Sequence, residues 1–301
     1  MAENRVPAVV PKRHKLTFRG VLRSEWIKVF SLRSTKWLMA MAVLVSTAAA
    51  LGYSALHWYM ESRRNLGEPI GIPEGAPIAM VPGEYGLLSS IVAQACTIAG
   101  TLLFSLLCVL IYTNEHSSGM IKATYVVAPR RGRVVIAKIF IILLLCVLLF
   151  GISLAASWGG SYLILQGGIG VDFTLLSPVS LRILGGALIN IALVGMFSFG
   201  VGAMFRSSAV AIAIVVTAIL IIPGIGLLLR EIMSLGLYAP SWEQWAAVAQ
   251  WFLPSRAGAL VMLENQPTSA PFGPWIGVGV LGAWTILTLF LGMIVVKRRD
   301  A

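Results

Sequence analysis

Six long apolar stretches alternate with shorter polar segments along this chain. They cover residues 37–60, 89–113, 139–165, 183–204, 209–229 and 274–296, and none of them contains Asp, Glu, Lys or Arg. A helix needs roughly 20 apolar residues to cross the hydrocarbon core of a bilayer. Its backbone groups must bond within the helix, because no water is available there. The pattern therefore predicts an all-α polytopic membrane protein, with six transmembrane helices in one domain over residues 1–301.

Basic residues are concentrated in every second polar segment. Eighteen Lys and Arg lie in residues 1–36, 114–138, 205–208 and 297–301, whereas five lie in the alternate segments. Cytoplasmic loops of membrane proteins carry the excess of Lys and Arg, so we expect both termini to be cytoplasmic. The net charge of +11 then reflects this orientation and attraction to anionic lipid. We therefore expect membrane lipid as a partner and no nucleic acid.

The residues before the first span predict an amphipathic helix over 17–35, after a basic tail over 1–16. One face of this helix collects Phe18, Val21, Leu22, Val29 and Leu32. Such a helix suits the cytoplasmic leaflet, but Glu25 intrudes on its apolar side. Two interpretations stay open. The helix is either a basic membrane anchor or a contact surface for a cytoplasmic partner, for which Glu25 is the residue that lipid alone would not favour.

The polar segment 114–138, NEHSSGMIKATYVVAPRRGRVVIAK, separates the second and third spans. Its first residues offer helix-start chemistry, Gly119 tightens the turn, and Pro129 closes a short apolar run. These features predict one or two short helices held against the membrane. The alternative is a plain basic loop that only sets the topology, although such a loop needs neither the Glu-His-Ser-Ser-Gly start nor an apolar face.

The longest segment on the opposite side of the membrane covers residues 230–273. Trp242, Trp245 and Phe252 fall on one helical face there, and tryptophan at this density suits the headgroup layer. We predict two short re-entrant helices with a turn at Pro254. Just before this segment, Pro223 and two nearby glycines predict a bend or break in the fifth span.

Several kinds of chemistry are missing from the sequence. It contains no G-x-x-x-x-G-K-[ST] phosphate-binding loop, no H-E-x-x-H zinc motif and no G-x-S-x-G nucleophile motif. The three cysteines all lie in apolar runs, where buried hydrophobic behaviour is the ordinary interpretation. Ion-coupled carriers usually place an ionisable residue at membrane depth, and the six stretches have none. We therefore expect no metal, cofactor or catalytic site in this chain, and an energy source outside it.

Three segments together resemble a known family. LRSEWIKVFSLRSTKW at 22–37, the 114–138 segment, and LPSRAGALVML at 253–263 are similar to the permease subunits of type-2 ATP-binding-cassette (ABC) exporters, especially the form common in actinobacteria. The likeness covers nearly the whole chain. Met120 departs from the family pattern, which usually has a small hydroxyl residue after the glycine.

The resemblance implies a permease of the bacterial cell membrane that exports an amphipathic or lipid-like substrate. Two permease copies, identical or paralogous, would pair, and two cytoplasmic ATPase subunits would bind ATP and Mg beneath them. ATPase contacts would come from the interfacial helix (Arg23, Glu25, Trp26, Lys28) and from the loop after the second span (Glu115, His116, Ser117, Ser118, Gly119, Met120, Lys122). The alternative function is a membrane sensor or assembly scaffold that kept the fold and transports nothing.

Overall fold

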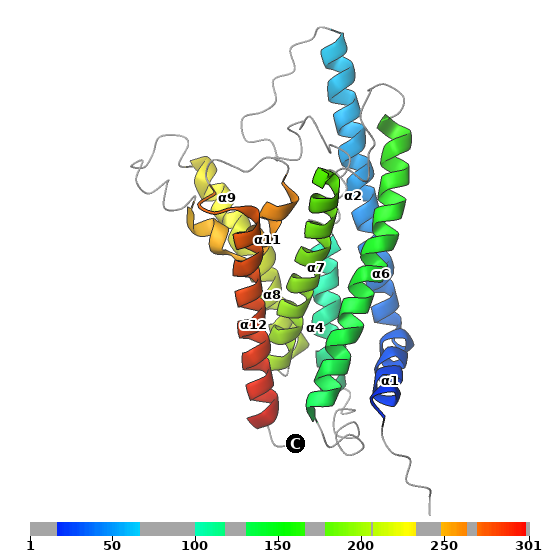
Figure 1. The fold of residues 1–301 in the computed structure, drawn as a ribbon, viewed down its shortest axis with the longest axis vertical. Helices are drawn as coiled ribbons and strands as arrows, with labels where there is room; N and C mark the ends of the chain where they lie inside the picture. Colours follow the sequence, from blue (N-terminus) through cyan, green and yellow to red (C-terminus); the bar gives the residue numbers. More distant parts are fainter. Residues whose placement is uncertain are drawn as a thin grey trace, which may run out of the picture.

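The chain forms a bundle of long helices, and the residues that the structure describes include no strand (Figure 1). The computed structural model describes residues 17–66, 100–117, 131–165, 178–205, 207–232, 248–263 and 270–298. Its longer helices are α1 (Phe18–Ser31), α2 (Arg33–Asn65), α4 (Thr101–Ser117), α6 (Arg131–Leu165), α7 (Pro178–Met204) and α12 (Pro274–Arg298). Shorter elements are α8 (Ser208–Val216), the π-helix η3 (Thr217–Ile221), α9 (Ile222–Ile232), the 3-10 helices η5 (Gln250–Phe252) and η6 (Leu260–Met262), and α11 (Pro254–Ala259).

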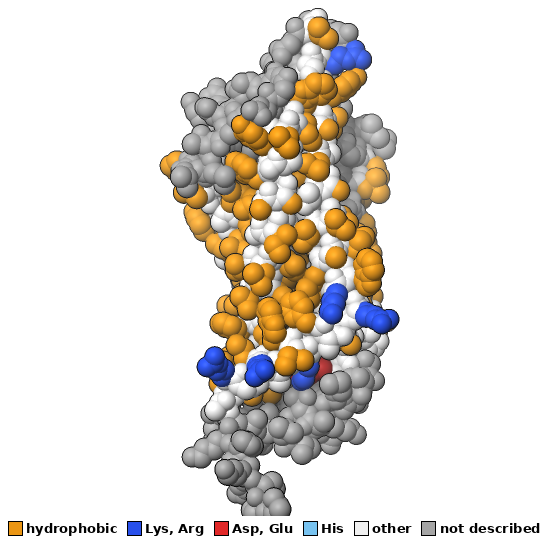
Figure 2. Space-filling model, turned by 90° about the vertical axis from the view of Figure 1, so that its right-hand side faces the viewer, with side chains coloured by type: hydrophobic (Ala, Val, Ile, Leu, Met, Phe, Trp, Pro, Cys, Tyr) orange, Lys and Arg blue, Asp and Glu red, His pale blue; other side chains and the backbone are white. Residues whose placement is uncertain are grey.

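Five helical stretches are long and apolar enough to cross a membrane. They are Arg33–Met60, Val134–Leu165, Pro178–Met204, Ser208–Gly226 and Pro274–Val296. An apolar band accordingly covers the middle of the bundle, and Lys and Arg side chains gather toward the α1 end (Figure 2). The prediction of an all-α polytopic membrane protein is thus confirmed. The second predicted span lies partly outside the described residues, where α4 supplies the shorter apolar stretch Thr101–Glu115, so the sixth crossing stays a prediction.

Helix α1 and the C-terminal end of α12 lie at the same end of the bundle (Figure 1). Helices α2 and α6 both start from this end and run parallel to each other, whereas α4, α7 and α12 run back toward it. The C-terminal end of α4 and the N-terminal end of α6 therefore both lie next to α1. This arrangement brings together three segments that are far apart in the sequence.

The predicted interfacial helix is shorter than 17–35. Helix α1 is capped by Thr17, whose hydroxyl accepts a hydrogen bond from the Gly20 backbone, and it ends at Ser31. Leu32 is extended, with φ −85° and ψ 128°, and α2 begins at the next residue. Residues 33–35 therefore belong to the first long helix, and the extended residue sets a corner between the two.

The boundaries of the 114–138 segment also differ from the prediction. Helix α4 continues to Ser117 and α6 already begins at Arg131. Glu115 thus lies in the last turn of α4, not at the start of a new helix, and Lys138 lies two turns inside α6. Residues 118–130, which carry the rest of the predicted coupling segment, lie outside the described residues.

The predicted bend near Pro223 takes the form of a π-helical turn. The helix runs on from Ser208 to Ile232, and η3 directly precedes the turn that holds Pro223. Proline cannot donate to the carbonyl four residues earlier, and its ring clashes with that carbonyl. A wider π turn absorbs such a conflict without breaking the helix. The helix therefore continues past the proline and the two glycines that follow.

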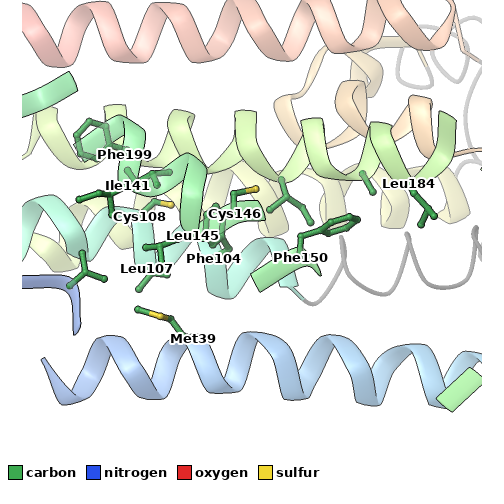
Figure 3. Packing of buried hydrophobic residues seen from close by; sticks show 14 of the residues in the cluster. Met39, Phe104, Leu107, Cys108, Ile141, Leu145, Cys146, Phe150, Leu184 and Phe199 are labelled. Carbon is green, nitrogen blue, oxygen red and sulfur yellow. The ribbon is translucent and has the colours of Figure 1, made fainter. Parts of the chain in front are cut away.

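The main core lies between α2, α4, α6 and α7 (Figure 3). Its labelled members include Met39, Phe104, Leu107, Cys108, Ile141, Leu145, Cys146, Phe150, Leu184 and Phe199. Cys108 and Cys146 are buried free thiols, as the sequence predicts. At the far end of the bundle, α11 packs against α7 and α12 through glycines. A methyl group at Gly277 would overlap the carbonyl oxygen of Ala257, and one at Gly258 would overlap the side-chain oxygen of Asn190.

We predict that Gly277→Ala destabilises the protein, because the added methyl group forces α11 away from α12. The expected cost is about 1–3 kcal/mol, typical of overpacking. Gly279→Ala is the matched control, since nothing lies within 4 Å of a methyl group there. The measurement is the temperature at which detergent-solubilised protein loses its monodisperse size-exclusion peak. Equal temperatures for the two variants would contradict the close approach of α11 and α12.

Candidate functional site: a buried ion cluster

Helix α1 docks on the start of α6 through its apolar face. Val21 and Leu22 pack against Val134 and Ala137, and two turns later Val29 joins the main core. Residues four apart share one face of a helix, so Glu25 points inward between these two valines. The structure thus explains the acidic residue on the apolar side of α1 by a contact within the chain.

Four charged side chains meet at this point and form the ion cluster Glu25, Lys28, Glu115 and Lys138. Lys138 Nζ lies 2.6 Å from Glu25 Oε2 and 2.9 Å from Glu115 Oε1. Lys28 Nζ lies 2.6 Å from Glu25 Oε1 and 2.9 Å from Glu115 Oε1. Each lysine therefore contacts both glutamates. The ring joins α1, the last turn of α4 and the first turns of α6.

The cluster is largely removed from solvent. The side chains of Glu25 and Lys138 are each 3% exposed, that of Glu115 is 9% exposed, and that of Lys28 is 23% exposed. A single buried charge costs several kcal/mol without a partner, but the four formal charges cancel. Lys138 also donates to the backbone oxygen of Ile111 at 3.5 Å. The balanced ring is thus tolerated, although only in one relative placement of the three helices.

The pairing keeps Lys28 and Glu115 ionised. Burial alone lowers the pKa of Lys28, but hydrogen bonds to Glu25 and Glu115 outweigh it and raise that pKa above its ordinary value. Burial alone raises the pKa of Glu115, which lies beyond the predicted second span. The ammonium of Lys138, followed by that of Lys28, outweighs this effect and lowers the pKa. Both partners therefore stay charged around neutral pH, and the ring holds through charge-assisted hydrogen bonds.

The predicted contact residues divide into two groups. On α1, Arg23 is exposed, Trp26 and Lys28 are half-buried, and Glu25 is buried. Trp26 packs against Phe30 with the two rings tilted by 43° and 4.6 Å between their centroids. On α4, Glu115 belongs to the ion cluster, and His116 and Ser117 follow it in the last turn, without described side chains. Ser118, Gly119, Met120 and Lys122 lie outside the described residues, so their assigned contact stays a prediction.

The outer predicted residues are described in part. Phe252 ends η5, where its carbonyl accepts a 3.0 Å hydrogen bond from Trp284 Nε1 on α12, and its ring meets that of Phe272 at 5.3 Å. Pro254 is the first residue of α11 after an extended Leu253. Trp242 and Trp245 lie outside the described residues. This outer element is packed by its aromatic residues and carries no charged cluster among its described residues.

Sequence reasoning overlooked the part that Lys138 has in the site. Lys138 was not among the predicted site residues, and Glu25 and Glu115 were predicted to contact a partner. A signal was present nonetheless. Two acids beside apolar faces and one lysine at the edge of a span each need an opposite charge nearby. Pairing them would have brought α1, α4 and α6 together before the structure was known.

Comparison with known proteins adds no family to this picture. No family model matches the chain, and no curated protein matches it. The resemblance to exporter permeases therefore stays a proposal that rests on the residues themselves.

We predict strong coupling within the ion cluster. Lys138→Met leaves Glu25 and Glu115 sharing one lysine, and loss of one buried partner typically costs about 3–5 kcal/mol. Glu25→Gln should also destabilise the protein, but the double variant should be less destabilised than the sum of the two, by about 0.5–3 kcal/mol. Thermal unfolding in detergent gives the four values of the cycle. Additive effects would show that the two residues do not interact.

Arg23→Met is the control for this cycle, because Arg23 lies on the same helix but is exposed. A surface substitution of this kind changes stability by less than about 0.5 kcal/mol. If Arg23→Met lowered the free energy of unfolding as much as Lys138→Met, any change of charge on α1 would be destabilising. The buried ion cluster would then have no special part in stability.

Proposed function

We propose that this chain is the membrane-spanning permease subunit of an ATP-driven exporter, powered by a separate cytoplasmic ATPase. The cargo is an amphipathic or lipid-like molecule that leaves the cytoplasm. Both termini then face the cytoplasm of a bacterial cell, a second permease copy completes the path, and ATP and Mg bind to the ATPase. The ion cluster is the observation that carries this proposal.

The ion cluster supports transmission of force from one end of the bundle. Helix α1 lies outside the membrane-crossing stretches, yet its Glu25 and Lys28 bond to charges on α4 and α6. A push on α1 is therefore passed to two long helices through short, charge-assisted contacts. Two packings of such helices, each matched to one ATPase conformation, are what an externally driven transporter requires.

The solvent-exposed face of α1, opposite Glu25, is the surface that an ATPase would contact. Arg19 and Arg23 are exposed there, and Ile27 is 55% exposed. Glu25 faces the opposite way, so in this proposal it positions α1 and does not touch the partner. An exposed apolar side chain between basic residues suits an acidic, partly apolar groove on the ATPase better than open water.

An ion-coupled carrier would also use buried charges, and Lys138 does lie within the apolar stretch Val134–Leu165. However, the carboxylates of Glu25 and Glu115 each already meet two lysines, and the cluster lies at one end of the bundle beside α1. A coupling ion would have to displace Lys28 or Lys138. These contacts therefore favour a structural role for the ion cluster, which holds three helices together, over a role as an ion-binding site.

The alternative of a sensor or scaffold shares all of these contacts. It differs in one respect, since a sensor needs no enzyme that hydrolyses nucleotide continuously. Substrate-stimulated ATP hydrolysis by the reconstituted complex distinguishes the two.

We predict that affinity-tagged chain, extracted in mild detergent, co-purifies with a phosphate-loop ATPase from its own host. Arg23→Glu should reduce the recovered ATPase by about tenfold, as expected for reversal of an interfacial charge. Arg23→Lys keeps the charge and should recover it fully. Mass spectrometry of the eluate gives the amounts. Recovery of no ATPase with the unaltered chain, or nucleotide hydrolysis by the chain alone, would contradict the proposal.

A further inference from the structure

A row of hydroxyl side chains follows the contact between α2 and α6. Ser153, Ser157 and Ser161 are spaced four residues apart on α6, and all three are buried. Ser46 and Ser54 on α2 are also buried, and Ser46 lines the same hollow as Ser153. We call this contact the hydroxyl seam and define it by these five serines together with Thr47.

Two kinds of hydroxyl occur in the hydroxyl seam. Ser46 and Ser54 donate to the carbonyls of Ala42 and Ala50 in their own helix, at 2.6 and 2.9 Å. This is the usual solution for serine in an apolar helix. The hydroxyl oxygens of Thr47, Ser157 and Ser161 are buried and have no hydrogen-bond partner among the described residues. Each such group costs about 1–3 kcal/mol.

The unpartnered hydroxyls lie close to one another along the helix axes. Gly160 on α6 packs directly on Leu51, since a methyl group at Gly160 would overlap that side chain. The two helices run in the same direction (Figure 1). Thr47 lies four residues before Leu51, and Ser157 lies three residues before Gly160. At about 1.5 Å rise per residue, Thr47 and Ser157 are therefore at nearly the same level.

The hydroxyl seam leads into a hollow in the bundle. Ser46 and Ser153 line it together with Gly100, Phe104, Cys146 and Phe150. Phe104, Cys146 and Phe150 lie in the interior between α4, α6 and α7 (Figure 3). The walls of the hollow combine hydroxyls with aromatic and aliphatic side chains, and its volume of about 20 Å³ is close to that needed by one water molecule, so a larger molecule fits only when the helices move apart.

We propose that the hydroxyl seam binds the uncharged polar head of an amphipathic molecule, which enters from the bilayer when α2 and α6 part. This inference rests on the proposed function and names the chemical class of its cargo. The molecule would come from the bilayer, because most of α2 faces away from the bundle: only 28% of its most apolar 18-residue window is buried inside the protein. A hydroxyl, amide or sugar head would bond to Thr47, Ser157 and Ser161, and its chain would lie along Phe104 and Phe150.

A charged head group is excluded by the composition of the walls. Residues 37–60 and 139–165 contain no Asp, Glu, Lys or Arg. A phosphate or carboxylate in the hydroxyl seam would therefore meet no Lys or Arg of these two stretches, whose one basic side chain is His57, about one turn beyond Ser54. Burying an anion there is far more costly than burying a neutral polar group. Ser157 and Ser161 can satisfy a neutral head, because a hydroxyl both donates and accepts hydrogen bonds.

The test uses cysteines placed at the unpartnered positions. Cys96, Cys108 and Cys146 are replaced by alanine, and Ser157→Cys or Ser161→Cys is added. The purified chain in lipid nanodiscs is treated with iodoacetamide, a small uncharged polar reagent, and alkylation is followed by mass spectrometry. The matched control is Ser198→Cys on α7, because Ser198 is equally buried but bonds to Val194 O at 2.8 Å.

Buried sites react only when the structure opens locally, so we expect alkylation at residues 157 and 161 to be about tenfold faster than at residue 198. Diacylglycerol in the nanodisc should slow this reaction, whereas phosphatidic acid with the same acyl chains should not. Alkylation as slow as the control would overturn the proposal. Protection by both lipids, or by neither, would overturn the assignment of an uncharged head. No ATPase is present in this assay, so a negative result leaves the proposed exporter function intact.

Discussion

The placement of α1 depends on one buried ring of charge. Glu25 and Glu115 cannot stay inside the protein without Lys28 and Lys138, and the two lysines cannot stay there without the acids. Because the ion cluster is buried, any shift of α1 costs free energy: it separates opposite charges that water no longer solvates. The apolar contacts of Val21 and Val29 supply attraction, but they would tolerate sliding along α6. The ion cluster removes that freedom. Helix α1 is thus fixed to the C-terminal end of α4 and the N-terminal end of α6, and it is not free to move along the lipid surface.

Helix α6 connects the ion cluster to the hydroxyl seam. Near its start, Lys138 belongs to the ion cluster, and Ser153, Ser157 and Ser161 follow in the hydroxyl seam about four to six turns further along. A continuous helix of 35 residues transmits a tilt along its length, since its backbone hydrogen bonds resist local bending. A movement imposed on α1 would therefore change the contact between α2 and α6. In the proposed exporter, a push on α1 and the opening of the hydroxyl seam would thus be linked through one continuous helix.

Much of this fold could be predicted from the sequence, because a bilayer requires long apolar helices and the chain contains runs of suitable length. The charge-free stretches located α2, α7 and α12 to within about five residues at each end, whereas α6 begins at Arg131, well before its predicted span at 139–165. The boundaries failed where polar residues continue a helix. Asn114 and Glu115 look like a loop start, yet they extend α4, because the lysines of the cluster satisfy Glu115. Likewise, Arg131 and Lys138 extend α6 although they look like loop residues. The ion cluster was missed because sequence periodicity places a residue on a face of its own helix and says nothing of which helix that face meets.

The rigid connection between α1 and α6 can be measured directly by electron spin resonance. Spin labels at residues 24 and 136, both exposed in this structure, would report the distance from α1 to α6 in a chain without its native cysteines. We expect one narrow distance distribution for the assembled complex, unchanged by ATP, and a broad one once Lys138 is replaced by methionine. A distance that is already broad in the unaltered cluster, or that shifts between the nucleotide-free and ATP-bound complex, would contradict the claim that the buried charges hold these helices together as one body.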